Sequence, residues 1–270
     1  MGEAFELVLF STAPPFIREA VASGIGAVIV DWEHEGKSAR QAGANTQINR
    51  DTPEDLRAVR ACTDSRVICR LNGYGEKTGV EIEQAIGIGV DELLLPMVRS
   101  VPEVEDVLER VGGRCGVGVL IETLAAVSLA GSLARLPLSR VYVGLNDLAI
   151  ERGSNTIFAP LVDGTLEEVR RHIRVPFGFG GLTVATLGDP IPCRLLIGEM
   201  LRLECDFSFL RRSFHRDIQG RRLAVEVPGL MTAIARARAR SPQNIDRDWR
   251  ELKDAVVTRP CSPFVVDEAP

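Results

Sequence analysis

The sequence predicts a (β/α)8 TIM barrel, and three observations lead to that fold class. Short β-rich runs alternate with amphipathic helical segments along most of the 270 residues. Several runs, such as AVIVD and ELLLPMV, are apolar almost throughout, as strands in a parallel sheet covered by helices must be. The repeat occurs eight times without a long linker, which favours a closed barrel over an open doubly wound sheet.

The expected strands follow one another along the chain with helical segments between them. No G-x-G-x-x-G follows the first of them, which argues against a dinucleotide-binding sheet. The eight strands are expected at 5–11, 27–34, 66–72, 92–98, 116–123, 140–148, 176–183 and 205–210.

The segments between the strands carry start and stop signals for helices. Thr52 is expected to cap a helix that begins at Pro53, with Asp55 as a short form of the capping-box acid. Gly89 and Gly112 stand where helices are expected to end, because glycine readily adopts the left-handed conformation found there.

The C-terminal part is less regular. Residues 217–240 have helical character that Pro228 and Gly229 are expected to break, and a tail with four prolines follows. The sequence therefore predicts one barrel domain at 1–240 and a C-terminal helical extension, at 241–270, that packs on the barrel or on a neighbouring subunit.

Composition excludes several functional classes. The formal net charge of −5 argues against a nucleic-acid or anionic-membrane partner, which would need a clustered basic surface. The basic run at 236–240 interleaves with alanine and resembles a solvated helix face. The six cysteines lack metal-ligand spacing and are expected as free thiols. No leader-like segment and no apolar run of about 18 residues is present, so a cytoplasmic location is expected.

Polar residues follow four of the apolar runs at the expected strand ends, which is where the active site of such a barrel forms. They are Asp31, Glu33 and His34 after the second run, Arg70 and Asn72 after the third, Glu122 after the fifth, and Asn146 and Asp147 after the sixth.

Glu122 and Asp147 suggest a metal site. Two carboxylates at the ends of neighbouring apolar strands are costly there unless a cation compensates them. A hard divalent cation does so and leaves coordination positions for water and an oxygen-rich substrate such as a 2-oxo acid. The alternative is a purely structural ion-pair network with Arg70.

Five of these segments together resemble the HpcH/HpaI aldolase and citrate lyase β-subunit family. The resemblance runs in order from about residue 10 to residue 214. Each motif is short, but all five lie at expected strand ends. The motifs are DWEH at 31–34, CRLN at 69–72, LLLPMV at 93–98, IET at 121–123 and VGLNDL at 143–148.

The resemblance implies class II aldolase chemistry on a 2-oxo acid and an aldehyde, with Mg²⁺, Mn²⁺ or Co²⁺ held by Glu122 and Asp147. It implies that Arg70 contacts the keto oxygen. It implies that His34 is the catalytic base and that Asp31 orients it. A homo-oligomer is implied in the same way.

The substrate carboxylate is assigned, by the same resemblance, to the backbone N–H groups of Gly144, Leu145, Asn146 and Asp147. Asn72 is expected near the mouth of the site. Lys37 is a further candidate for a distal anionic group of the substrate, and it is equally compatible with an exposed loop lysine.

The chemistry fits these assignments. Cleavage of a 4-hydroxy-2-oxo acid removes a hydroxyl proton and delivers electrons to the 2-oxo group, so positive charge at the forming enolate lowers the barrier. His34 is suited to the proton transfer because an unperturbed histidine titrates near neutrality. A surface histidine is the alternative. His172 and His215 are weaker candidates, since one lies in an arginine-rich helix and the other follows the eighth strand.

Two departures from the family pattern leave the acceptor open. Residues 35–37 read Glu-Gly-Lys where aldolases of this family commonly have a proline-containing loop, and Leu145-Asn146 replaces a Pro-x pair. A citrate-lyase-like enzyme acting on an acyl-CoA thioester is the enzymatic alternative. A barrel that binds a 2-oxo acid without turning it over is the non-enzymatic one.

Overall fold

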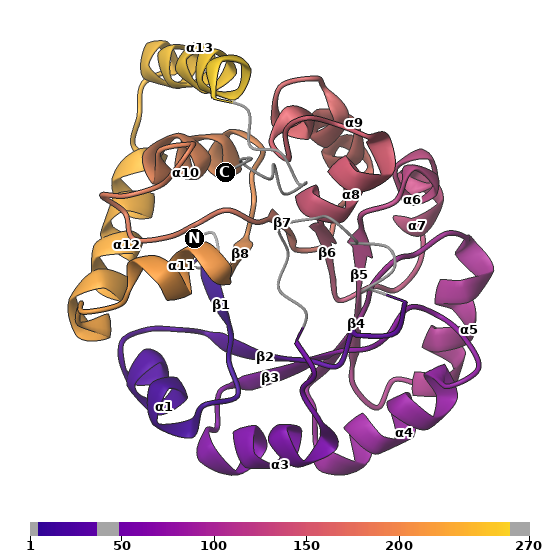
Figure 1. The fold of residues 1–270 in the computed structure, drawn as a ribbon. Helices are drawn as coiled ribbons and strands as arrows, with labels where there is room; N and C mark the ends of the chain where they lie inside the picture. The colour runs from indigo at the N-terminus through magenta and orange to yellow at the C-terminus, as the bar shows by residue number, and fades with distance from the viewer. Residues whose placement is uncertain (1–4, 37–48, 260–270) are drawn as a thin grey trace, which may run out of the picture.

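The computed structural model describes residues 5–36 and 49–259, and it is a closed barrel of eight parallel strands in sequence order, surrounded by helices (Figure 1). The predicted fold class is therefore confirmed. The strands are β1 (Glu6–Phe10), β2 (Ala27–Asp31), β3 (Arg66–Arg70), β4 (Glu92–Leu95), β5 (Gly116–Ile121), β6 (Arg140–Val143), β7 (Phe177–Phe179) and β8 (Phe207–Leu210).

Helices follow the strands and cover the outside of the barrel. No helix in the described ranges is both long and apolar enough to cross a membrane. The helices are α1 (Pro14–Ala22), α3 (Pro53–Cys62), α4 (Thr78–Ile88), α5 (Val101–Val111), α6 (Leu124–Ser128), α7 (Ala130–Leu133), α8 (Leu145–Arg152), the 3-10 helix η1 (Ala159–Leu161), α9 (Thr165–His172), α10 (Cys193–Arg202), α11 (Arg212–Asp217), α12 (Leu223–Arg238) and α13 (Pro242–Thr258).

The local signals for helix ends behave as the sequence predicts. Thr52 Oγ1 accepts a hydrogen bond from the Asp55 N–H, and the Asp55 carboxylate accepts one from the Thr52 N–H, which completes the capping box. Gly89 and Gly112 both end their helices in the left-handed conformation.

Several strands are shorter at their C-terminal ends than the sequence suggests. β4 stops at Leu95 because Pro96 follows and has no N–H to donate to the ladder. β6 stops at Val143 because Gly144 already caps α8. The apolar character of the sequence continues past these points, so the apolar pattern alone does not mark where the chain leaves the sheet.

The C-terminal part differs from the sequence prediction at one point, the proline. α12 continues through Pro228, which is exposed, so the carbonyl that loses its partner near Ala224 faces water. Residues 242–258 form one regular helix, α13, in agreement with the predicted C-terminal helical extension. α13 packs beside α10 (Figure 1). Asp248 of α13 forms an ion pair with Arg240 at 2.5 Å.

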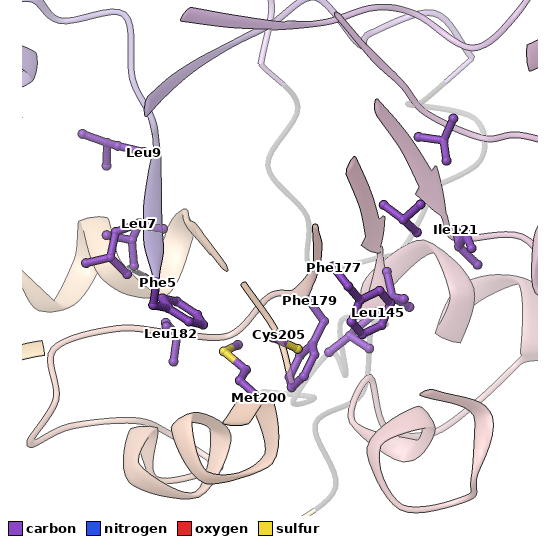
Figure 2. Close-up of a cluster of buried hydrophobic side chains, with 14 of the residues drawn as sticks. Phe5, Leu7, Leu9, Ile121, Leu145, Phe177, Phe179, Leu182, Met200 and Cys205 are labelled. Carbon is purple, nitrogen blue, oxygen red and sulfur yellow. The ribbon is translucent and has the colours of Figure 1, made fainter. Parts of the chain in front are cut away.

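Alternate residues of each strand face opposite sides of the sheet, and this sorts the core into two layers. Figure 2 shows part of the outer layer, where Leu7 and Leu9 on β1 and Phe177 and Phe179 on β7 lie between the strands and the helices. The inner layer fills the barrel with Val8, Phe10, Ala27, Ile29, Ile68, Leu94, Leu120, Tyr142, Phe207 and Phe209.

The N-terminal end of the barrel interior is closed by an ionic layer that we call the base cluster: Glu6, Arg66, Glu92 and Arg140. Arg140 is 2% exposed and donates from Nε to Glu92 Oε1 at 2.7 Å and from Nη1 to Glu6 Oε2 at 3.0 Å. Two carboxylates thus face two guanidiniums. Burial alone lowers the pKa of Arg140, but the carboxylates of Glu92 and Glu6 more than offset this effect and raise it.

Candidate active site

A second ionic layer lies at the opposite end of the barrel, where the strands end. Four of its members stand two residues beyond an inner-layer side chain of their own strand, so they point into the same space; Glu33 and Asp147 come from the loop after β2 and from the first turn of α8. We call it the mouth cluster, and it consists of Asp31, Glu33, Arg70, Glu122, Asp147 and Arg211.

Arg70 and Asp31 form the buried centre of the mouth cluster. Arg70 is 3% exposed and Asp31 is fully buried. The guanidinium donates from Nε to Asp31 Oδ1 at 2.8 Å and from Nη2 to Oδ2 at 2.7 Å, which is a bidentate pair. Its Nη1 lies 3.2 Å from the Glu33 carboxylate. All three nitrogens of Arg70 are thereby fixed in orientation.

Arg211 adds a second cation to the same carboxylate. Its Nη2 lies 3.2 Å from Asp31 Oδ2. Arg70 and Arg211 also lie over the Phe10 ring, at 5.2 and 4.9 Å from its centroid. Burial and then the nearby Arg70 lower the pKa of Arg211.

Glu122 carries a buried carboxyl group close to other carboxylates. It is 2% exposed, and its Oε1 accepts a hydrogen bond from the Met97 N–H at 2.9 Å. Burial, followed by the charges of Asp147 and Glu33, raises its pKa from the ordinary 4.5 to about 8. Without a cation beside it, this carboxyl therefore holds its proton near neutral pH.

Asp147 stands in the first turn of α8, next to Glu122, and is 8% exposed. The helix begins so close to Glu122 that only glycine fits at its cap. A Cβ on Gly144 would lie 2.2 Å from Glu122 Oε2. The first helical hydrogen bond of α8 runs from the Leu148 N–H to the Gly144 carbonyl at 3.2 Å, so the N–H groups of Leu145 and Asn146 precede the ladder. Such a helix start favours an anion.

A cavity of about 440 Å³ opens onto the mouth cluster. Arg70, Glu122, Asp147 and Arg211 line it, together with residues 144–146 at the start of α8. The remaining lining residues are Phe10, Leu120, Tyr142, Ile157, Phe158, Gly180, Gly181, Thr183, Gly188, Asp189, Pro190, Ile191, Leu196, Phe209, Arg212, Ser213 and Arg216.

His34 follows this centre in the chain and is exposed, outside the lining of the cavity. Its Nδ1 donates to the Trp32 carbonyl at 2.7 Å, because a carbonyl oxygen only accepts. This bond leaves Nε2 as the acceptor nitrogen. The orienting group therefore differs from the expected one: the Asp31 carboxylate holds Arg70, and a backbone carbonyl holds His34.

Asn72 also has a different role from the expected substrate contact. Its Oδ1 accepts hydrogen bonds from the His34 and Glu35 N–H groups at 2.9 and 2.8 Å, and its Nδ2 donates to Glu81 at 2.6 Å. Asn72 thus fixes the backbone that carries His34, and it does not line the cavity. Lys37 lies outside the described residues.

No third His, Cys, Asp or Glu joins Glu122 and Asp147 in a ready-made metal cage within residues 5–36 and 49–259. A two-carboxylate donor set still fits one class of ion. Mg²⁺ and similar hard cations keep several waters and bind through one or two carboxylates plus the substrate. The five cysteines of the described ranges are free thiols, as the sequence predicts.

Three site residues do not follow from the sequence motifs alone. Arg211 stands two residues beyond the inner-layer Phe209, and Tyr142 stands two residues beyond Arg140 of the base cluster, so strand parity turns both into the barrel interior. Glu33 was visible as a strand-end acid, but only the structure pairs it with Arg70. All three could be predicted from the alternation of side chains along a strand, but only with the correct strand bounds.

Comparison with known proteins points to one family. The model of the HpcH/HpaI aldolase/citrate lyase family matches residues 6–156, more than half of the chain. No curated protein matches it in sequence. The crystal structure of RipC from Yersinia pestis is similar at a TM-score of 0.55 and 16% identity, covering 89% of this chain and 98% of that one. This structural likeness concerns the fold alone.

Proposed function

Since the chain belongs to the HpcH/HpaI aldolase/citrate lyase family, we propose that it is a divalent-metal-dependent carbon–carbon lyase that cleaves or forms 4-hydroxy-2-oxo acids through a pyruvate enolate. The observation that carries the proposal is the charge of the mouth cluster. Its four carboxyl groups face two guanidiniums, and Glu122 holds its proton with a pKa of about 8. A divalent cation would compensate this excess.

Glu122 and Asp147 are the side chains that would hold the cation. When bound, it supplies positive charge close to the oxygen atoms of a 2-oxo acid. The N–H groups of Leu145 and Asn146 at the start of α8 would hold the substrate carboxylate. The Arg70 guanidinium, fixed by Asp31 and Glu33, would then face the keto oxygen and stabilise negative charge as it develops there.

His34 is the proposed base for the hydroxyl proton. Its Nε2 is the free acceptor of the ring, and the hydrogen bond from Nδ1 to the Trp32 carbonyl supports that tautomer. Asn72 supports the same segment through the backbone. In this scheme Asp31 acts on Arg70 instead of on His34.

The lining of the cavity indicates the charge of the second substrate, the acceptor. A cavity of about 440 Å³ exceeds the space that a three-carbon acid fills, and Arg212 and Arg216 also line it. These cations favour an acceptor that carries negative charge. That chemistry is compatible with an aldehyde acid and with an acyl-CoA thioester, so both belong in the assay.

The experiment uses chelator-treated protein supplied with Mg²⁺, Mn²⁺ or Co²⁺, pyruvate and either short aldehydes or acyl-CoA thioesters. We expect aldol product that disappears with EDTA and in Glu122→Gln and Asp147→Asn. Arg57→Lys, on the surface of α3, is the matched control and should retain activity. Pyruvate binding without product from any acceptor would indicate a binding protein, and product that survives both carboxyl substitutions would overturn the metal site.

A further inference from the structure

Tyr142 carries a hydroxyl that the proposed chemistry does not yet use. The residue belongs to the inner layer of the barrel, is 9% exposed, and lines the cavity. Its hydroxyl makes no hydrogen bond with any side chain or backbone group of residues 5–36 and 49–259. A nearly buried phenol that faces a cavity without a protein partner is suited to a partner from outside the protein.

The ring of Tyr142 is held in place by packing. It stacks on Phe209 at 3.8 Å between centroids with an interplanar angle of 15°. Phe207 lies on the same side at 6.1 Å. The hydroxyl therefore has a fixed position, because moving it would require moving the stacked pair.

Gly180 leaves the space into which that hydroxyl projects. A Cβ on Gly180 would lie 2.3 Å from the Tyr142 hydroxyl oxygen, whereas the next ring atom, Cζ, would be 3.6 Å away. Any larger residue at 180 would thus collide with the oxygen alone. The glycine fits a hydroxyl at 142, and it would not be required beside a phenylalanine.

The charges around the phenol suit a hydrogen-bond donor. Burial raises the pKa of Tyr142 well above the usual range, although Arg211 and Arg70 act in the opposite direction. The phenol therefore keeps its proton throughout the neutral range. Arg70, proposed to face the keto oxygen, and Glu122, proposed to hold the cation, are among the groups that influence its pKa.

From these observations we propose that the Tyr142 hydroxyl, which lies against Gly180, donates a hydrogen bond to an oxygen atom of the 2-oxo acid bound in the cavity. The inference rests on the proposed function, because that function supplies the ligand. It adds a substrate-contacting residue near the end of β6, three residues before Leu145, where the proposed carboxylate site begins.

The first test is Tyr142→Phe, which removes one oxygen and no ring atom. We expect kcat/KM for the aldol reaction to fall about 10- to 100-fold, the range for a hydrogen bond to a charged group. Tyr74→Phe is the matched control, because Tyr74 is 41% exposed, bonds Asp106, and is the other tyrosine of the chain. Melting temperatures of both variants report whether the fold is kept.

The second test uses Gly180→Ala in both backgrounds. With Tyr142 present, the new methyl meets the hydroxyl, and we expect a loss at least as large as that of Tyr142→Phe. In the Tyr142→Phe background the nearest ring carbon is 3.6 Å away, so the same substitution should add little further loss. Equal losses from Gly180→Ala in both backgrounds would overturn the pairing of the two residues.

A direct readout comes from fluorine NMR of protein labelled with 3-fluorotyrosine. Two resonances are expected for the two tyrosines, and Tyr74→Phe assigns them. Adding pyruvate with Mg²⁺ should shift the Tyr142 resonance and leave the Tyr74 resonance unchanged. Calorimetry gives pyruvate affinity independently. Absence of pyruvate binding to the wild-type protein overturns the proposed function and this inference together, whereas binding that neither shifts Tyr142 nor weakens in Tyr142→Phe overturns the inference alone.

Discussion

The two ends of the barrel interior both carry a layer of buried charge, and they differ in balance. At the base, Arg140 and Arg66 meet Glu6 and Glu92, two charges against two. At the mouth, four carboxyl groups meet Arg70 and Arg211. The balanced layer completes its own hydrogen bonds, and the unbalanced layer leaves a carboxyl that holds its proton. This difference separates a layer suited to stability from one suited to binding a cation and a substrate.

Matched arginine substitutions at the two ends test this difference most directly. Arg70→Lys keeps the charge but loses the planar fork held by Asp31 and Glu33, and we expect kcat to fall about 10²- to 10³-fold. Arg140→Lys makes the same change at the base and should leave kcat unchanged. Steady-state kinetics of the aldol reaction measure both. Similar losses of kcat at the two ends would mean that the layers do not differ in function.

Removing the charge at the base should affect stability instead. Arg140→Met leaves Glu92 buried without its main partner, and we expect the free energy of unfolding in urea to fall by about 3–5 kcal/mol. Adding Glu92→Gln should restore part of this loss, because the uncompensated charge is then absent. Arg57→Met, which breaks an exposed pair with Glu54, is the control and should change little. A double variant less stable than Arg140→Met would contradict the account.

The free energy of unfolding should depend on pH differently in the wild-type protein and in Glu122→Gln. Glu122 titrates at about 8 in the folded protein against an ordinary 4.5, so its contribution is fully present below 4.5 and is lost as pH rises through about 8. Chelator-treated wild type should therefore lose up to about 1.4 kcal/mol per pH unit across that window. Glu122→Gln should remove this part of the slope. Equal slopes of the unfolding free energy against pH in the two proteins, between pH 4.5 and about 8, would refute the assignment.

The smallest effects come from the neutral groups that support each layer. Ser139→Ala removes the hydrogen bond from Oγ to Glu92 at 2.6 Å and should lower the free energy of unfolding by about 1 kcal/mol without affecting kcat. Asn49→Ala removes the bond from Nδ2 to Asp31 at 3.2 Å and should lower kcat instead, about tenfold. Thermal melts and kinetics on both variants distinguish the two ends, and an exchange of the two outcomes would reverse the proposed roles.

The fold could be predicted from the sequence because eight apolar runs separated by capped helices leave little alternative. The site could be predicted only in part. Arg70, Glu122 and Asp147 were expected at strand ends, and the structure brings them to one cavity. Asp31, which the sequence assigns to orient His34, binds Arg70 in the structure, and sequence spacing does not tell which atoms meet across strands. Parity does: Asp31 faces the barrel interior with Arg70, while His34 has already left the strand.

The one C-terminal expectation that the structure contradicts has a simpler origin. The sequence predicts a break at Pro228, yet this proline lies in the first half of α12, where the lost backbone bond faces water. The bounds of α13 have weak local signals, because Leu252 and Val256 are its buried positions. Packing on α10 stabilises this helix, and packing between distant segments is not visible in a local pattern.

The seam between β7 and β8 has a consequence for motion. The two strands share one register pair, Gly178 with Phe207, whereas β2 and β3 share five. Fewer ladder bonds make this the place where the barrel opens with the lowest free energy. Amide hydrogen exchange should be fastest along β7, and Gly180 and Arg211, which flank the cavity from the two sides of the seam, would separate during such opening.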